Sequence, residues 1–122
     1  MAQNTAGQTL TQVGSGGITQ SAGGSVVFDA TAITAADYVE IVCGFQPTYV
    51  VWENNTDRTR GEWFQGMAAN SCLKTVAAGT RTLEVTGGNG GITQTSTGFR
   101  VLQNATLALI LASKTCTWHA FA

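Results

Sequence analysis

The sequence contains few charged residues. Aspartate, glutamate, lysine and arginine make up 11% of its 122 residues, against about 25% in ordinary soluble domains. The net charge is −1 and the six basic residues are scattered, so counterion release from a phosphate backbone would supply little affinity. Low charge also leaves little repulsion to oppose association. We therefore expect no nucleic-acid partner, and we expect a subunit that works within an assembly.

Long hydrophobic runs are also missing. The longest run, Leu107 to Ala112, is far shorter than the roughly twenty residues that cross a bilayer, so no membrane partner is expected. The N-terminus has neither the basic opening nor the apolar core of a secretion signal. This predicts a protein that is made and kept in the cytoplasm unless it leaves inside a larger particle.

Residues that bind metals are scarce. Cys43, Cys72 and Cys116 are widely spaced, form no Cys-x-x-Cys pair, and each falls within or beside an apolar run. A zinc site would need paired spacing and more than the single histidine, His119. We predict buried structural thiols and no metal or other cofactor, while a disulfide stays open.

Catalytic motifs are absent from the sequence. It has no Gly-x-Ser-x-Gly elbow, no His-Glu-x-x-His and no phosphate-binding loop. Only Glu53, Glu62 and His119 support a small hydrolase, and they are more simply read as a solvated turn and a packed histidine. We predict that the protein is not an enzyme.

Short apolar runs separated by Gly, Asn, Asp and Pro fill the chain from Ser25 onward. This spacing predicts an all-β fold, an antiparallel β-sandwich or jelly-roll-like barrel. Alternation places Val39 and Ile41 on one face of their strand, and Cys116, Trp118 and Ala120 on one face of the last strand. One helical turn is expected within Ile33 to Val42. The predicted strands are Ser25 to Asp29, Tyr38 to Cys43, Thr48 to Asn54, Gly61 to Gln65, Ser71 to Val76, Arg81 to Thr86, Gly98 to Gln103, and Thr106 to Phe121 as one long or two adjacent strands.

Two of these strands flank a polar turn, Asn54 to Gly61, and predict a long β-hairpin. Five of the thirteen charged residues lie at or beside this turn, which makes it the most solvated surface of the protein. The hairpin is therefore a leading candidate for specific contact. Its candidate interface residues are Asn55, Asp57, Arg58, Arg60 and Trp63.

The first 28 residues carry no charged side chain. Residues 1–24 are mostly Gln, Thr, Ser, Gly and Ala, with Leu10, Val13 and Ile18 as isolated apolar residues. Either a flexible tail or an arm fits this composition, but disordered tails usually carry charge. We predict an extended arm over residues 1–24 that lies across a neighbouring subunit, and a single β domain over residues 25–122. Leu10, Val13 and Ile18 are the arm's candidate interface residues.

The last two thirds of the chain resemble a known group of proteins. Several short sequences carry the resemblance: Gly44-Phe45-Gln46-Pro47-Thr48-Tyr49-Val50, Asn55-Thr56-Asp57, Glu62-Trp63-Phe64-Gln65-Gly66-Met67, Lys74-Thr75, Gly79-Thr80 and Gly98-Phe99. In their order and spacing they resemble small virion structural proteins of tailed bacteriophages, which serve as capsid decoration or cement proteins.

The resemblance implies an oligomeric β-sandwich or jelly-roll subunit, a dimer or trimer, on the outer surface of a capsid. Its partners would be the major capsid protein and further copies of itself, and it would be made in the host cytoplasm. The alternative is a tail- or fibre-associated module that binds host glycans. Trp52, Trp63 and the polar hairpin tip are the residues that favour this alternative.

Overall fold

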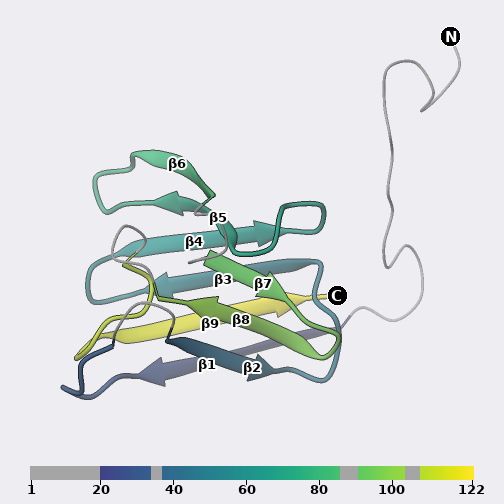
Figure 1. Cartoon of the computed structure of the whole chain (residues 1–122), viewed down its shortest axis with the longest axis horizontal. Coiled ribbons are helices and arrows are strands. Elements are labelled where there is room, and N and C mark those ends of the chain that lie inside the picture. Colours follow the sequence, from purple (N-terminus) through teal and green to yellow (C-terminus); the bar gives the residue numbers. More distant parts are fainter. Residues whose placement is uncertain (1–19, 34–36, 86–90, 104–107) are drawn as a thin grey trace, which may run out of the picture.

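The computed structural model describes residues 20–33, 37–85, 91–103 and 108–122. These residues form one antiparallel sheet of nine strands that is curled into a half-barrel (Figure 1). The predicted all-β class is confirmed. Within the described ranges there is no helix, and hence none that could cross a membrane. Of the segment predicted to hold a helical turn, residues 34–36 lie outside the described residues, and the part from Tyr38 onward is a strand.

The strands are short and follow one another closely along the chain. They are β1 (Ser21–Val27), β2 (Tyr38–Val42), β3 (Tyr49–Asn54), β4 (Thr59–Phe64), β5 (Ser71–Thr75), β6 (Arg81–Val85), β7 (Gly91–Gln94), β8 (Gly98–Leu102) and β9 (Thr115–Phe121).

The sheet begins with β1 and ends with β2. Its strand order is β1-β9-β3-β4-β5-β7-β8-β2, and β6 pairs with β5 beside this path. Because every pairing is antiparallel, strand direction alternates along the sheet. β1 and β2 therefore run in opposite directions, as their arrowheads show in Figure 1. Although they are consecutive in sequence, these two strands do not pair with each other.

The concave face of the sheet holds the hydrophobic core. Its largest fully buried side chains are Trp52 and Phe99, whose rings meet edge to face with centroids 6.5 Å apart. Such an aromatic pair contributes about 0.5–1.5 kcal/mol beyond its buried area. The other buried apolar residues are Phe45, Val50, Trp63, Cys72, Ile92, Val101, Leu109, Ile110, Cys116 and Ala120.

The segment before β9 corrects one prediction. Of the expected strand Thr106 to Phe121, only Thr115–Phe121 is extended; residues 108–114 are irregular, and residues 104–107 lie outside the described ones. Ala108 and Ser113 have φ of 53° and 63°, which a strand cannot accommodate. Leu109 and Ile110 are nevertheless buried, and the Trp52 indole N–H donates to the Leu109 carbonyl at 2.9 Å. The apolar run therefore indicates burial and not a strand. We call this irregular buried segment, residues 108–114, the core plug.

The β3–β4 hairpin confirms the predicted one, with a tighter turn. Strand β4 starts at Thr59, two residues earlier than predicted, so the loop spans only residues 55–58. The buried Asn54 side chain closes this loop: its Oδ1 accepts from the Asp57 N–H at 3.2 Å, and its Nδ2 donates to the Ala108 carbonyl at 3.1 Å. The turn is therefore tied to the core plug beneath it.

Two further strands differ from prediction. β1 spans Ser21–Val27 and not Ser25 to Asp29, so the sheet includes residues 21–24, which were predicted as part of the arm. Glycines usually weaken a strand, but here the His119 and Trp118 rings lie against Gly23 and Gly24. β7 was not predicted, because only four residues pair there and they directly follow a glycine-rich stretch of the sequence.

Gly98 is required for the pairing of β2 with β8. A Cβ atom there would lie 1.8 Å from the carbonyl oxygen of Ile41, and backbone cannot yield as a side-chain tip can. We expect Gly98→Ala to lower the free energy of unfolding by about 2 kcal/mol or more, measured by urea denaturation. Ser96→Ala, in the exposed turn beside it, is the control. Equal stability of the two variants would contradict this packing.

Candidate functional site

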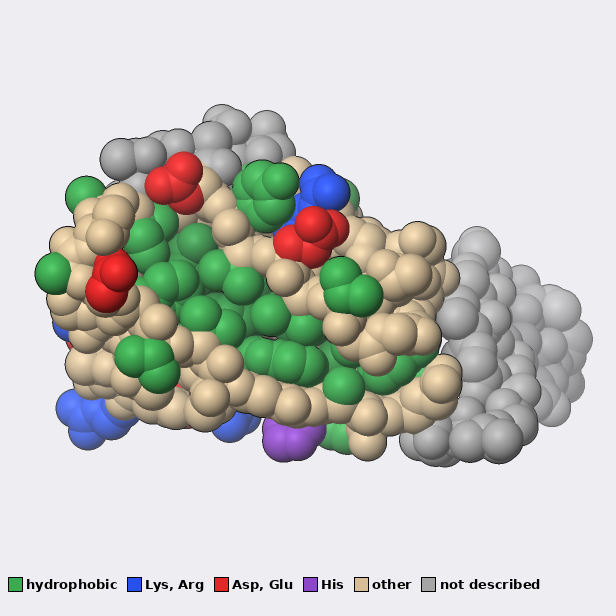
Figure 2. Space-filling model, turned by 90° about the horizontal axis from the view of Figure 1, so that it is seen from below, with side chains coloured by type: hydrophobic (Ala, Val, Ile, Leu, Met, Phe, Trp, Pro, Cys, Tyr) green, Lys and Arg blue, Asp and Glu red, His purple; other side chains and the backbone are tan. Residues whose placement is uncertain are grey.

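The half-barrel is open between β1 and β2. Half-buried apolar side chains face this opening: Ala22 and Val26 from β1, Val39 and Ile41 from β2, and Trp118 from β9. All of them pack against the buried core. We call this opening the groove. Figure 2, which looks onto the molecule from below relative to Figure 1, shows a hollow filled with hydrophobic side chains and charged side chains only around its margin.

Gly24 and Trp118 together form one wall of the groove. A Cβ atom at Gly24 would stand 3.0 Å from atoms of the Trp118 indole, so the ring rests directly on the β1 backbone. On its other side the ring meets Phe99 edge to face, with centroids 5.5 Å apart. The indole therefore connects the groove to the core.

One end of the groove widens into a hollow of about 460 Å³. Phe28, Ile33, Val39 and Ile110 give it an apolar lining, and two carboxylates, Asp29 and Asp37, are part of the same wall. The Thr31 backbone N–H donates to Asp29 Oδ1 at 2.9 Å and lowers the pKa of this carboxyl. The hollow is thus apolar inside with acidic groups in its wall.

The strands that flank the groove expose apolar side chains on the convex side. Val27 is 73% exposed, Tyr38 54% and Val42 71%. Arg100 lies over the Tyr38 ring at 5.2 Å and pairs with Glu40 at 3.2 Å. These three exposed residues, the rim of the groove, extend its apolar surface outward.

Both flanking strands are edge strands. Within the described part of the chain, β1 pairs only with β9 and β2 only with β8. Each strand therefore presents a row of backbone N–H and C=O groups that is ready to pair with an added strand. A third edge, β6, carries exposed Leu83 and Val85 on the far side of β5.

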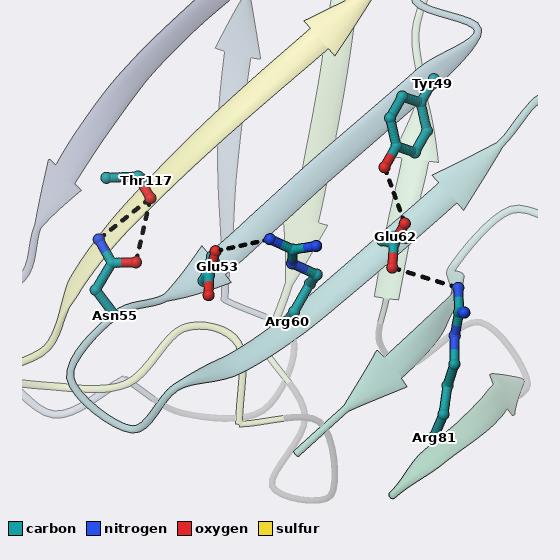
Figure 3. Close-up of polar contacts among 7 residues, drawn as sticks. All are labelled: Tyr49, Glu53, Asn55, Arg60, Glu62, Arg81 and Thr117. Carbon is teal, nitrogen blue, oxygen red and sulfur yellow. Dashed lines mark hydrogen bonds and ion pairs between the residues drawn. The ribbon is translucent and has the colours of Figure 1, made fainter. Parts of the chain in front are cut away.

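The predicted contact residues at the hairpin tip are largely bonded within the molecule (Figure 3). Asn55 Nδ2 donates to Thr117 Oγ1 at 3.1 Å, Arg60 pairs with Glu53 at 3.2 Å, and Lys114 pairs with Asp57 at 3.1 Å. Arg58 is exposed, with a φ of 58°. Since exposed ion pairs contribute about 0–1 kcal/mol, these groups could exchange partners at small cost.

Trp63 is not available as a contact residue. Its side chain is only 3% exposed, faces the core, and donates its indole N–H to the Ala68 carbonyl at 3.1 Å. Trp52 is fully buried as well. The assignment of these two tryptophans to a glycan-binding surface is therefore wrong, because strand alternation turns both rings inward. Leu10, Val13 and Ile18 lie outside the described residues.

The two carboxylates considered for hydrolysis both bond to other side chains. Glu53 pairs with Arg60, whereas Glu62 accepts from the Tyr49 hydroxyl at 2.9 Å and pairs with Arg81 at 3.3 Å (Figure 3). Burial, followed by the bond to Glu62, raises the pKa of Tyr49. Both glutamates thus hold neighbouring strands together.

His119 belongs to a row of stacked rings on the convex face. Tyr49 stacks on Phe64 at 4.7 Å and on Phe121 at 5.7 Å, and His119 stacks on Phe121 at 5.8 Å. The row crosses β4, β3 and β9. Because the rings face one another, their faces are largely used within the row.

The three thiols are unpaired, so the structure contains no disulfide among them. Cys72 and Cys116 are buried, as predicted, and Cys43 is half-buried. Burial raises the pKa of Cys72 to about 12 and that of Cys116 to about 11, from an ordinary value of 9.0. Among the described residues, no three His, Cys, Asp or Glu side chains gather as a metal site.

These thiols predict a loss of stability at alkaline pH. Above pH 9 the unfolded thiols ionise while the folded ones keep their protons, so each buried thiol lowers the free energy of unfolding by at most about 1.4 kcal/mol per pH unit. Below pH 9 the contribution is constant. Urea denaturation between pH 8 and about 10.5 should give a shallower slope for Cys72→Ala than for the native chain.

The matched control is Ser71→Ala, which removes a buried hydroxyl next to Cys72. It should lower stability by a similar amount at every pH. A Cys72→Ala slope as steep as the native one would refute this role of the buried thiol.

Comparisons with protein-family models, with curated proteins and with solved structures find no match to this chain. The candidate site is therefore defined by the structure alone.

Sequence reasoning found part of the groove. Alternation placed Val39 and Ile41 on one face of their strand and Trp118 on one face of the last strand, and in the structure both faces point inward. It missed the opening itself, because whether β1 and β2 pair with each other is a property of the whole sheet. The run of neutral residues through Ser21–Val27 is the one local signal, since protected edge strands usually carry charge.

Proposed function

We propose that this protein is a virion structural protein, a capsid decoration or cement subunit that binds the outer surface of a phage shell and stabilises it. The observation that carries the proposal is the groove: an apolar hollow between two edge strands of an open half-barrel. A half-buried apolar lining and unpaired strand edges gain free energy from a covering partner.

The choice of a capsid as the partner rests on the resemblance to decoration and cement proteins. In this role each subunit contacts the major capsid protein and neighbouring copies, and the shell's symmetry multiplies modest contacts into large resistance to internal pressure. The sandwich or jelly-roll arrangement stays a prediction. Since the nine described strands form a single curled sheet, we propose that any second layer comes from a neighbouring subunit.

The glycan-binding alternative has less support. Its two tryptophans are core residues, which leaves a convex hollow of about 330 Å³ beside the stacked rings of Tyr49 and Phe121. Sugars stack on open ring faces, and these faces meet one another instead. We likewise propose no catalytic role, because Glu53 and Glu62 are each bonded to an arginine.

The proposal predicts that the protein binds to virions at high copy number. Shells purified without it should break at a lower temperature than native shells. The release of DNA on heating measures this temperature. Adding the purified protein should restore the native temperature. Recovery at only a few copies on the tail, or shells equally stable without it, would defeat the proposal.

The arm gives a second prediction. Removing residues 1–19 leaves β1 intact, so the shortened chain should keep a cooperative unfolding transition yet bind shells more weakly, measured by co-sedimentation. Leu83→Asp, at an exposed position on β6, is a control that alters a different edge of the sheet. Undiminished shell binding by the shortened chain would contradict a role for the arm.

A further inference from the structure

The groove is too exposed to be complete in an isolated subunit. Its lining includes half-buried Val26, Val39, Ile41 and Trp118, and the described residues supply no strand that covers them. Because β1 and β2 run in opposite directions, one added strand would run antiparallel to one of them and parallel to the other. A single extended segment could thus pair with either edge.

We propose that residues 1–19 of a second copy of this chain occupy the groove. This inference rests on the proposed assembly role and names the partner segment. The segment carries no charged side chain, so no charged side chain has to leave water when it enters an apolar hollow. Leu10, Val13 and Ile18 provide apolar contacts, while the neutral Thr and Gln side chains suit a partly exposed strand.

The segment is long enough to reach a neighbour. Nineteen extended residues span roughly 60 Å, whereas the seven residues of β1 extend about 23 Å. The Ala122 N–H donates to the Gln20 carbonyl at 2.9 Å, which continues the β1–β9 ladder to Gln20. The chain therefore enters β1 in line with the strand, and occupying its own groove would require a reversal before this point.

The rim also favours a second copy over the chain's own segment. Val27, Tyr38 and Val42 are exposed on the convex side of the flanking strands, where a strand inside the groove would leave them uncovered. A neighbouring subunit that donates its arm also brings its body against this rim. Each copy then gives one arm and receives another, an arrangement that closes into a dimer or a small ring.

The test is complementation between two full-length variants. The arm variant carries Leu10→Asp and Ile18→Asp and keeps a native groove. The rim variant carries Val27→Asp and Val42→Asp, at exposed positions of the folded subunit, and keeps a native arm. Light scattering after size-exclusion chromatography gives the mass, and circular dichroism verifies that each variant is folded.

We expect the native chain to form an oligomer and each variant alone to associate at least about tenfold more weakly. An equal mixture should form a one-to-one pair, because the native arm of the rim variant can enter the groove of the arm variant, whose rim is native and can contact the donor's body. In that pair, amide hydrogens of β1 and β2 should exchange more slowly, and those of β6 should not. A control chain with Leu83→Asp and Val85→Asp on β6 should associate like the native protein.

A native chain that stays monomeric, which includes one whose arm fills its own groove, would overturn this inference. So would an arm variant that associates like the native chain, or a mixture that forms no pair. None of these measurements uses a capsid. Failure of shell binding with successful complementation would therefore refute the proposed function and leave the arm exchange intact.

Discussion

The backbone of a strand has hydrogen-bonding groups on both sides, and an edge strand leaves one side open to an added strand; in this protein two such edges flank one opening. Among the residues that the structure describes, β1 is held only by β9, and β2 only by β8. Natural sheets usually protect their edges with charges, prolines or bulges. β1, Ser21–Val27, contains no charged residue and no proline. β2 contains one charged residue, Glu40. An unprotected edge suits a subunit whose edge is meant to be paired.

Part of the half-barrel's interior is filled by a segment that is not a strand. Leu109 and Ile110 enter the interior from an irregular segment, and the Trp52 indole holds that segment by its hydrogen bond to the Leu109 carbonyl. Gly61 makes room for the same plug, since a Cβ there would lie 2.8 Å from Leu109. The interior thus stabilises the fold, and the groove that we propose for recognition lies between the two end strands of the sheet.

Much of the sheet could be predicted from the sequence because its strands obey local rules. Alternation and turn residues located the β3–β4 hairpin, and alternation also gave the residues that share one face in β2 and in β9. Local rules failed where tertiary contacts decide the conformation. Residues 108–114 have a strand-like composition, but the positive φ of Ala108 and Ser113 is incompatible with a strand, and the segment forms the core plug instead. Trp63 was predicted as an interface residue, and this is wrong because its register in β4 turns the ring inward.

The three tryptophans differ in their surroundings, and this gives the groove a built-in optical reporter. Trp52 and Trp63 are buried in the core, whereas Trp118 is half-buried at the opening. Indole fluorescence shifts to shorter wavelength when water leaves the ring, so covering the groove changes the emission of Trp118 while the other two rings stay in the same environment. The colour of the emitted light therefore distinguishes a covered subunit from an open one without any added label.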